Sequence, residues 1–289
     1  MERYKIEPLA DGFGAEVTGL DLAAETGADE MAALRRRFHD SQLMVIRNQK
    51  IEPRRFLWFA RHFGRPQPHI AAHLRHKEVP EILPLSNIFV DDKPTGIFDG
   101  AAFWHQDMAY EDVASNATIV HAIKVPDRGG ETLFADMRAA YDALEPGIRK
   151  RIAGLVACHR YGNRADEDYN TRTKAMELTA EEQEQVRDVF HPLVLAHPVT
   201  GRPALYGAAS TSRGIRGLED AEARALLDAL AEHASQDRFV HAHRYRPGDI
   251  VLWDNFSLMH KATLIDRASG PGTQRYLHRI STKDLPATA

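Results

Sequence analysis

The chain is 289 residues long, 43% hydrophobic and 27% charged, with a formal net charge of −4. This balance is ordinary for a water-soluble globular protein, and it lacks the basic excess that nucleic-acid binding favours. No apolar run approaches the roughly 20 residues of a membrane span, and the N-terminal residues lack a signal-peptide pattern. Cys158 is the only cysteine, so no internal disulfide can form, and we expect a cytoplasmic protein.

The N-terminal part of the chain shows alternating hairpin and helix patterns. The helical periodicity of the first helix places Met31, Leu34 and Phe38 on one face. Pro53 opens the second helix and Gly64 ends it. The expected elements are a hairpin over 4–22, a helix over 28–41, a strand over 42–49 and a helix over 53–64.

From about residue 80 the pattern changes to short β runs separated by turns. The expected strands lie within 81–90, 101–108, 116–125, 129–137, 191–198, 203–207, 239–245, 249–255 and 275–283. Helices are expected over 137–155 and 219–235, and the polar segment 159–177 has the character of a mobile lid. Many short strands with a few helices predict one domain over 1–289, mainly β with α. Its core is a double-stranded β-helix, or jelly roll, flanked by helices.

The tripeptide His105-Gln106-Asp107 is the most informative motif in the chain. On an extended strand, residues i and i+2 point to the same face, so His105 and Asp107 would share one cavity while Gln106 points away. His260 follows the expected strand 249–255 by a short loop that could aim it inward. Two imidazoles and one carboxylate form the facial triad of non-haem Fe(II) oxygenases, which leaves coordination positions open for chemistry.

Two other interpretations stay open at this point. A His–Asp pair at a strand end can simply be hydrogen-bonded, without a metal. His241 and His243 also satisfy the i, i+2 spacing, so a zinc site made of histidines remains an alternative, as does a solvated strand face. The chain has fifteen histidines, and we expect most of them at the surface, although the excess favours a metal site.

Five motifs in the same order resemble one family over nearly the whole chain. They are GFGAEVTGLDL, WHQD, GGETLFADM, GDIVLWDNFSLMHKA and RYLHRIST. The chain resembles the Fe(II)/2-oxoglutarate-dependent dioxygenases of the taurine dioxygenase and 2,4-dichlorophenoxyacetate dioxygenase type (TauD/TfdA). The resemblance implies Fe(II), 2-oxoglutarate and O2 as cofactor and cosubstrates, with His105, Asp107 and His260 as the iron ligands.

The resemblance also implies how 2-oxoglutarate is held. Thr132 matches the threonine that hydrogen-bonds the cosubstrate, and Arg279 matches the arginine that holds its distal carboxylate. A planar guanidinium presents two parallel donors to a carboxylate, which lysine cannot copy. Arg275 lies four residues earlier and faces the same side of a strand; it is the second choice for this role, with a surface ion pair as the alternative.

Candidate substrate contacts are His69, Asn87, Met108 and Tyr110, each with an ordinary packing role as the alternative. His69 aligns with a position that contacts the sulfonate in taurine dioxygenases. Ala72 replaces the neighbouring aromatic of that family, so taurine itself is a poor fit. Met108 and Tyr110 directly follow the metal motif.

The leading hypothesis is therefore an oxygenase that hydroxylates a small, anionic organic substrate, in some cases cleaving it, with release of succinate and CO2. Desaturation or isonitrile formation in natural-product biosynthesis would use the same cofactor chemistry. The alternative of another class is a non-catalytic metal- or ligand-binding jelly roll, which predicts loss of a triad member or of the cosubstrate arginine. We expect a small-molecule substrate, no nucleic-acid or membrane partner, and a homo-oligomer, either dimer or tetramer.

Overall fold

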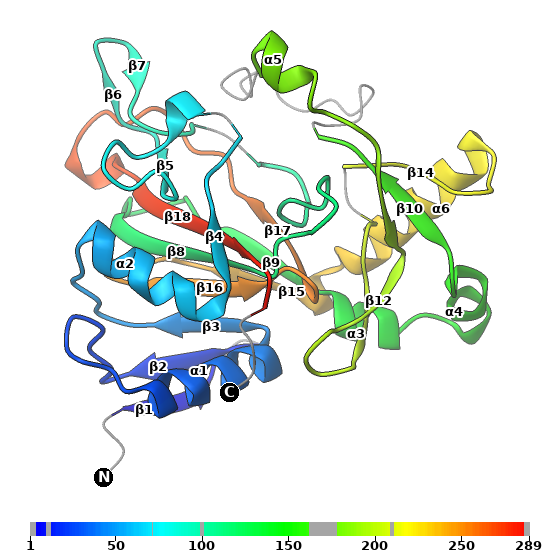
Figure 1. The fold of residues 1–289 in the computed structure, drawn as a ribbon, viewed down its shortest axis with the longest axis horizontal. Helices are drawn as coiled ribbons and strands as arrows, with labels where there is room; N and C mark the ends of the chain where they lie inside the picture. Colours follow the sequence, from blue (N-terminus) through cyan, green and yellow to red (C-terminus); the bar gives the residue numbers. More distant parts are fainter. Residues whose placement is uncertain are drawn as a thin grey trace.

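The structure is a computed structural model that describes residues 4–9, 13–70, 72–98, 101–161, 178–208 and 211–285. Two facing β-sheets form its centre (Figure 1). The larger has the order β1-β2-β3-β16-β8-β18-β4, with β5 also paired to β18. Its strands are β1 (Lys5–Pro8), β2 (Ala15–Thr18), β3 (Leu43–Ile46), β16 (Ile250–Asp254), β8 (Ala117–Lys124), β18 (Tyr276–Lys283), β4 (Arg65–Gln67) and β5 (Leu83–Ser86). The smaller sheet contains β15 (Val240–His243), β9 (Thr132–Asp136) and β17 (Leu258–Ala262).

Alternation along the strands of the larger sheet explains how it is covered on both faces. On β16, Val251 and Trp253 pack toward the smaller sheet with Phe134 of β9. Ile250 and Leu252, between them in the sequence, point to the other face and pack against helices. This double burial is the packing expected of a jelly roll.

Two helices cover the outer face of the larger sheet, as the sequence predicts. α1 (Ala28–Ser41) begins and ends where its periodicity indicated, and Met31, Leu34 and Phe38 are fully buried. α2 (Pro53–Ala60) continues as a 3-10 turn over residues 61–63. Gly64 then adopts a φ of 148°, in the region that favours glycine, and directs the chain into β4.

A second group of elements packs beside the smaller sheet (Figure 1). It consists of α3 (Met137–Asp142), α4 (Pro146–Ile152), α6 (Asp220–Ala234) and two small sheets. These are β11-β10-β14 and the β12-β13 hairpin, made of β10 (Val156–His159), β11 (Val189–Pro192), β14 (Ser212–Ile215), β12 (Val194–Ala196) and β13 (Pro203–Leu205). The remaining elements are the short α5 (Ala180–Gln183) and the hairpin of β6 (Phe89–Val90) and β7 (Lys93–Pro94).

Two expectations of secondary structure are wrong. The helix expected over 137–155 is two helices, α3 and α4, because Pro146 starts a new helix rather than continuing the first. The strand expected over 101–108 is irregular, with a single β-bridge at His105 and a turn from Asp107. Of the expected lid, residues 162–177 lie outside the described part of the chain. Within the described part, no helix is long and apolar enough to cross a membrane.

Candidate active site

The backbones of His105 and His260 pair directly with each other. The N–H of each donates to the carbonyl of the other at 2.9 Å, which forms an isolated antiparallel bridge. His260 therefore lies in strand β17 and not in the loop that the sequence suggested. Asp107 reaches the same place through a turn, helped by Met108 at a φ of 56°, so the strand argument for His105 and Asp107 is wrong although their convergence is correct.

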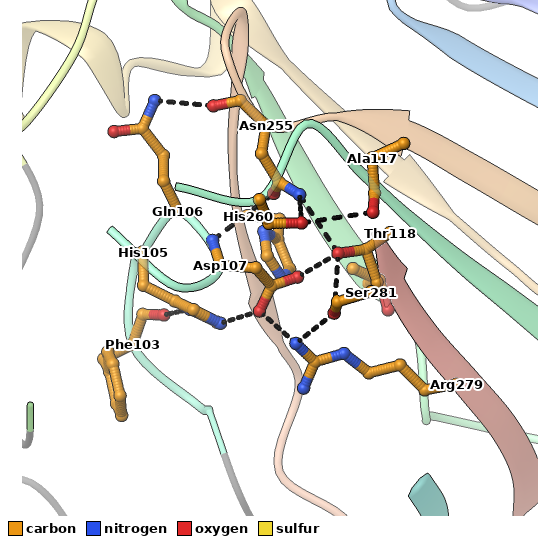
Figure 2. A network of polar contacts seen from close by, with 12 residues as sticks. Phe103, His105, Gln106, Asp107, Ala117, Thr118, Asn255, His260, Arg279 and Ser281 are labelled. Atoms are coloured by element: carbon orange, nitrogen blue, oxygen red, sulfur yellow. Dashed lines mark hydrogen bonds and ion pairs between the residues drawn. The ribbon is translucent and has the colours of Figure 1, made fainter. Parts of the chain in front are cut away.

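The three side chains meet in one buried cluster (Figure 2). Nε2 of His105 lies 3.6 Å from Oδ1 of Asp107, and Nε2 of His260 lies 3.6 Å from Oδ2. Nδ1 of His105 is 2.8 Å from the carbonyl of Phe103. Because a carbonyl only accepts, Nδ1 carries the proton and Nε2 presents its lone pair to the cluster, as a metal ligand must.

The charges of the cluster also suit a divalent cation. Burial would raise the pKa of Asp107, but Arg279 and His260 lower it well below its usual range, so it is a carboxylate at neutral pH. Burial, followed by the nearby His105, lowers the pKa of His260, so its imidazole is neutral. One carboxylate and two imidazoles form a donor set that fits Fe(II).

A second buried cluster has the same composition but a different hydrogen-bonding pattern. His39, His197 and Asp254 also lie within ligand distance of one another. The backbone N–H groups of Val199 and Thr200 donate to Nδ1 of His197, so its proton is on Nε2, which donates to Asp254 at 2.6 Å. A protonated Nε2 has no lone pair for a metal.

Arg138 also argues against a metal ion in this second cluster. Its guanidinium, 1% exposed, already lies 3.7 Å from the carboxylate of Asp254 and supplies a positive charge there. This second cluster is therefore a structural hydrogen-bonded group. The two clusters have the same composition, and they differ in the tautomer of one histidine: Nε2 is unprotonated in His105 and protonated in His197.

The competing pair His241 and His243 does not form a metal site in the described part of the chain. Both are buried, so the solvated strand face suggested by the sequence is also wrong. Nε2 of His243 lies 3.9 Å from Asp249, which pairs with Arg47. Burial, followed by Arg47, lowers the pKa of His243 to about 3, so it is a neutral core residue.

Thr132 and Arg275 lie on either side of Tyr245, a residue that sequence reasoning missed. The hydroxyls of Thr132 and Tyr245 are 2.9 Å apart, and the guanidinium of Arg275 lies 5.8 Å from the centre of the tyrosine ring. Arg275 is 9% exposed and forms no ion pair with a described carboxylate, so the surface ion pair suggested for it is wrong. Its Nε donates to the carbonyl of Gly130 at 3.3 Å.

Arg279 lies elsewhere, beside the cluster of His105, Asp107 and His260. Its Nη2 donates to Oδ1 of Asp107 at 2.5 Å and to Ser281 at 3.0 Å (Figure 2). It also lines a pocket together with three of the four candidate substrate residues, His69, Met108 and Tyr110. The structure thus places Arg279 beside Asp107 and the pocket, and Arg275 near Tyr245, which contacts Thr132.

Asn87 is the fourth candidate substrate residue, and the structure gives it another role. Its amide donates to the carbonyls of Asp266 and Thr273 at 2.8 Å and accepts from the N–H of Arg275 at 2.7 Å. The side chain is 1% exposed and does not line the pocket of Arg279. The expectation that it reaches that pocket is wrong, because its hydrogen bonds hold the segment that leads to Arg275.

Comparison with known proteins decides the family. Residues 5–281 match the family described as "Taurine catabolism dioxygenase TauD, TfdA family". The 2,4-dichlorophenoxyacetate dioxygenase of Cupriavidus pinatubonensis is 32% identical, with 96% of each chain covered. The chain belongs to the TauD, TfdA family. It is accordingly a non-haem iron dioxygenase that depends on 2-oxoglutarate (alpha-ketoglutarate), and the jelly roll is the fold of that family.

Other TauD, TfdA relatives differ in their named reactions. The (S)-phenoxypropionate/alpha-ketoglutarate-dioxygenase of Sphingobium herbicidovorans is 34% identical over 90% of this chain and 89% of its own. The pentalenolactone F synthase of Streptomyces arenae is 28% identical over 95% and 94%. Among solved structures, AAD-2 in complex with Mn(II) and N-oxalylglycine superposes with a TM-score of 0.78 at 28% identity, covering 99% of both chains.

Proposed function

We propose that the protein hydroxylates a small organic acid, and that His105, Asp107 and His260 hold its Fe(II). The observation that supports this most directly is the convergence of the three ligands beside Arg279 and its pocket. When bound, the iron supplies activation of O2, coupled to oxidation of 2-oxoglutarate to succinate and CO2. The protein itself has to hold the cosubstrate, orient the substrate and exclude water.

We assign the distal carboxylate of 2-oxoglutarate to Arg275 and Thr132, in place of Arg279 and Thr132. Burial lowers the pKa of Arg275, because a guanidinium without a carboxylate partner is poorly solvated inside the protein. An entering carboxylate would compensate that charge with two parallel hydrogen bonds. Thr132 can donate a third, and Tyr245 contacts both residues.

Arg279 then serves the substrate. Its guanidinium lines the pocket with His69 and Tyr110, next to the carboxylate of Asp107. Burial, followed by the neighbouring Tyr161, raises the pKa of Tyr110, so its phenol remains a neutral hydrogen-bond donor. A cationic group and a neutral donor in one pocket suit a substrate carboxylate.

The relatives support an aryloxyalkanoate as that substrate. Both 2,4-dichlorophenoxyacetate and phenoxypropionate, named for two relatives that are 32% and 34% identical, carry a carboxylate next to an aryl ether. Hydroxylation of the carbon that bears the ether oxygen gives a hemiacetal or hemiketal, which collapses with loss of the phenol. Net cleavage would therefore follow from simple hydroxylation.

A natural-product substrate is the second candidate, because pentalenolactone F synthase is similar over almost the whole chain. The non-catalytic alternative has no support, since it required a broken triad or a missing arginine. His105, Asp107 and His260 are present and adjacent, and both Arg275 and Arg279 are present.

The test is a succinate-release assay with purified protein, Fe(II), 2-oxoglutarate and a panel of aryloxyalkanoates, alkylsulfonates and terpenoid acids. We expect release above the substrate-free rate only with carboxylates, together with phenol formation from aryl ethers. An Asp107→Ala variant should release none. Equal activity of that variant would refute the iron site, and release only with sulfonates or only with terpenoid acids would refute the aryloxyalkanoate assignment.

A further inference from the structure

We infer that Thr118 and Asn255 are positioning residues that hold the carboxylate of Asp107 in the orientation needed to bind the metal. This inference rests on the iron site proposed above. Asp107 lies in a turn, so no strand pairing fixes its backbone, unlike that of His105 and His260. Something else must hold its side chain in place, and the contacts around it show what does (Figure 2).

The hydroxyl of Thr118 forms a short hydrogen bond to Oδ2 of this carboxylate. Thr118 is the second residue of β8 and fully buried, with Oγ1 2.6 Å from Oδ2 of Asp107. An ionised carboxylate only accepts, so the single proton of the hydroxyl points to Asp107. The lone pairs of Thr118 then accept from the amide of Asn255 at 3.0 Å and from the hydroxyl of Ser281 at 3.2 Å.

Asn255 fixes the threonine and the aspartate together. Its Oδ1 accepts from the backbone N–H of Asp107 at 3.3 Å, so its Nδ2 must face the other way. Nδ2 donates to Thr118 and to Ser115, at 3.0 and 3.1 Å. Every polar atom of this fully buried amide is thus in use, and it cannot flip without losing these bonds.

Gln106 completes the arrangement from the middle of the metal motif. Its Nε2 donates to the backbone carbonyl of Asn255 at 3.1 Å, and its Oε1 accepts from the N–H of Gly207 at 3.1 Å. The side chain that the sequence assigned to point away therefore fastens the turn to the segment that follows β13. The chain Gln106–Asn255–Thr118 holds Asp107 through its backbone on one side and its carboxylate on the other.

The test compares Mn(II) binding by variants of Thr118, of Asn255 and of a control threonine. Thr118→Val keeps the shape of the residue but removes the donor, whereas Thr118→Ser keeps the donor. Thr282→Val is the matched control, because Thr282 is a fully buried threonine on the adjacent strand whose hydroxyl donates to Asn116 at 2.7 Å. Mn(II) dissociation constants are measured by electron paramagnetic resonance, and unfolding midpoints by circular dichroism.

We expect Thr118→Val to bind Mn(II) roughly 10- to 100-fold more weakly than the wild type, the loss usual for partners of metal ligands. Thr118→Ser should restore binding, and Thr282→Val should lower stability without changing Mn(II) affinity. Asn255→Asp, which turns a donor into an acceptor, should weaken Mn(II) binding as Thr118→Val does.

Two outcomes would overturn the inference. One is unchanged Mn(II) affinity in Thr118→Val and in Asn255→Asp. The other is a loss of affinity in Thr282→Val as large as that in Thr118→Val. If Thr118→Val does not fold, Thr118→Ala replaces it in the comparison with Thr118→Ser. Failure of the wild-type protein to bind Mn(II) would instead refute the iron site itself, so the two failures are distinguishable.

Discussion

At the scale of single residues, two arginines four positions apart have different surroundings, with Arg275 just before β18 and Arg279 within it. Arg275 adjoins Thr132 through Tyr245, whereas Arg279 contacts Asp107. We therefore expect Arg275→Ala to weaken 2-oxoglutarate binding roughly 10- to 100-fold, because hydrogen bonds to charged groups contribute about 1.5–3 kcal/mol. Anaerobic titration of the weak visible band of the Fe(II)–2-oxoglutarate chelate measures this.

Arg279→Ala is the matched comparison, since it removes the same type of side chain four residues further along the chain. It should raise KM for the organic acid, because the variant loses an interaction with that substrate. The affinity for 2-oxoglutarate should stay within about threefold of the wild type. The reverse pattern, with 2-oxoglutarate affinity lost in Arg279→Ala and kept in Arg275→Ala, would restore the assignment that the sequence suggested.

Residue identities predicted the cluster of His105, Asp107 and His260 but not the different surroundings of the two arginines. The three residues were predictable as a candidate metal site because few residue types bind iron in that combination. The choice between Arg275 and Arg279 depends on what lies opposite each of them. Those surroundings depend on the tertiary fold, and the sequence around Tyr245 does not indicate that this residue will contact Thr132 and Arg275.

At the scale of elements, the turn at Gly64 joins the helical layer to the larger sheet. Its φ is 148°, and a Cβ there would lie 2.6 Å from the backbone oxygen of Lys283 in β18. Gly64→Ala should therefore lower the free energy of unfolding by about 1–3 kcal/mol, since neither the strain nor the clash with backbone can relax easily. Urea denaturation gives the value.

Gly147→Ala is the control for that substitution. Gly147 lies in α4, and a Cβ there would meet nothing within 4 Å. Alanine should be neutral or stabilise by up to about 1 kcal/mol, because it is the better helix former. Equal destabilisation by both substitutions would show that the turn at Gly64 is not specially constrained.

Elements with a strong period were predictable, and those set by a single contact were not. Met31, Leu34 and Phe38 repeat over fourteen residues of α1, and the helix matches its predicted bounds. In the segment 101–108 only Phe103 and Trp104 favour strands, and the segment has one bridge partner, His260. The sequence pattern describes propensity, whereas the number of neighbours decides whether a strand forms.

At the scale of the whole molecule, buried neutral histidines make stability sensitive to acid. Several of the fifteen histidines are buried, contrary to the expectation that most lie at the surface: His39, His105, His121, His159, His197, His241, His243, His260 and His278. Burial, followed by His191, lowers the pKa of His159 to about 3. Burial, followed by His76, lowers that of His278 to about 4.

These shifts determine the direction of the pH dependence. Below about pH 6.5 the unfolded chain binds protons that the folded protein cannot accept until about pH 3 to 4. The free energy of unfolding is therefore highest above pH 6.5 as far as these histidines are concerned. It falls as the pH drops, by about 1.4 kcal/mol per pH unit for each such histidine. Urea denaturation between pH 7.5 and 4.5 measures the slope.

His243→Gln should flatten that slope, because the pKa of His243 is also lowered to about 3, by burial and then by Arg47. The exposed His73 is the control, and His73→Gln should leave the slope unchanged. An identical slope in the wild type and in His243→Gln would contradict the account.

The reciprocal backbone bridge between His105 and His260 has a consequence for chelation. The two hydrogen bonds of this bridge join backbone groups of the fold and do not involve a metal ion. Treatment with EDTA should therefore leave the circular dichroism spectrum unchanged, and both amide protons should stay protected from deuterium. Loss of that protection on removal of the metal would show that the backbone bridge forms only when the ion is bound. Persistence would mean that the enzyme can lose its metal and be reconstituted without refolding.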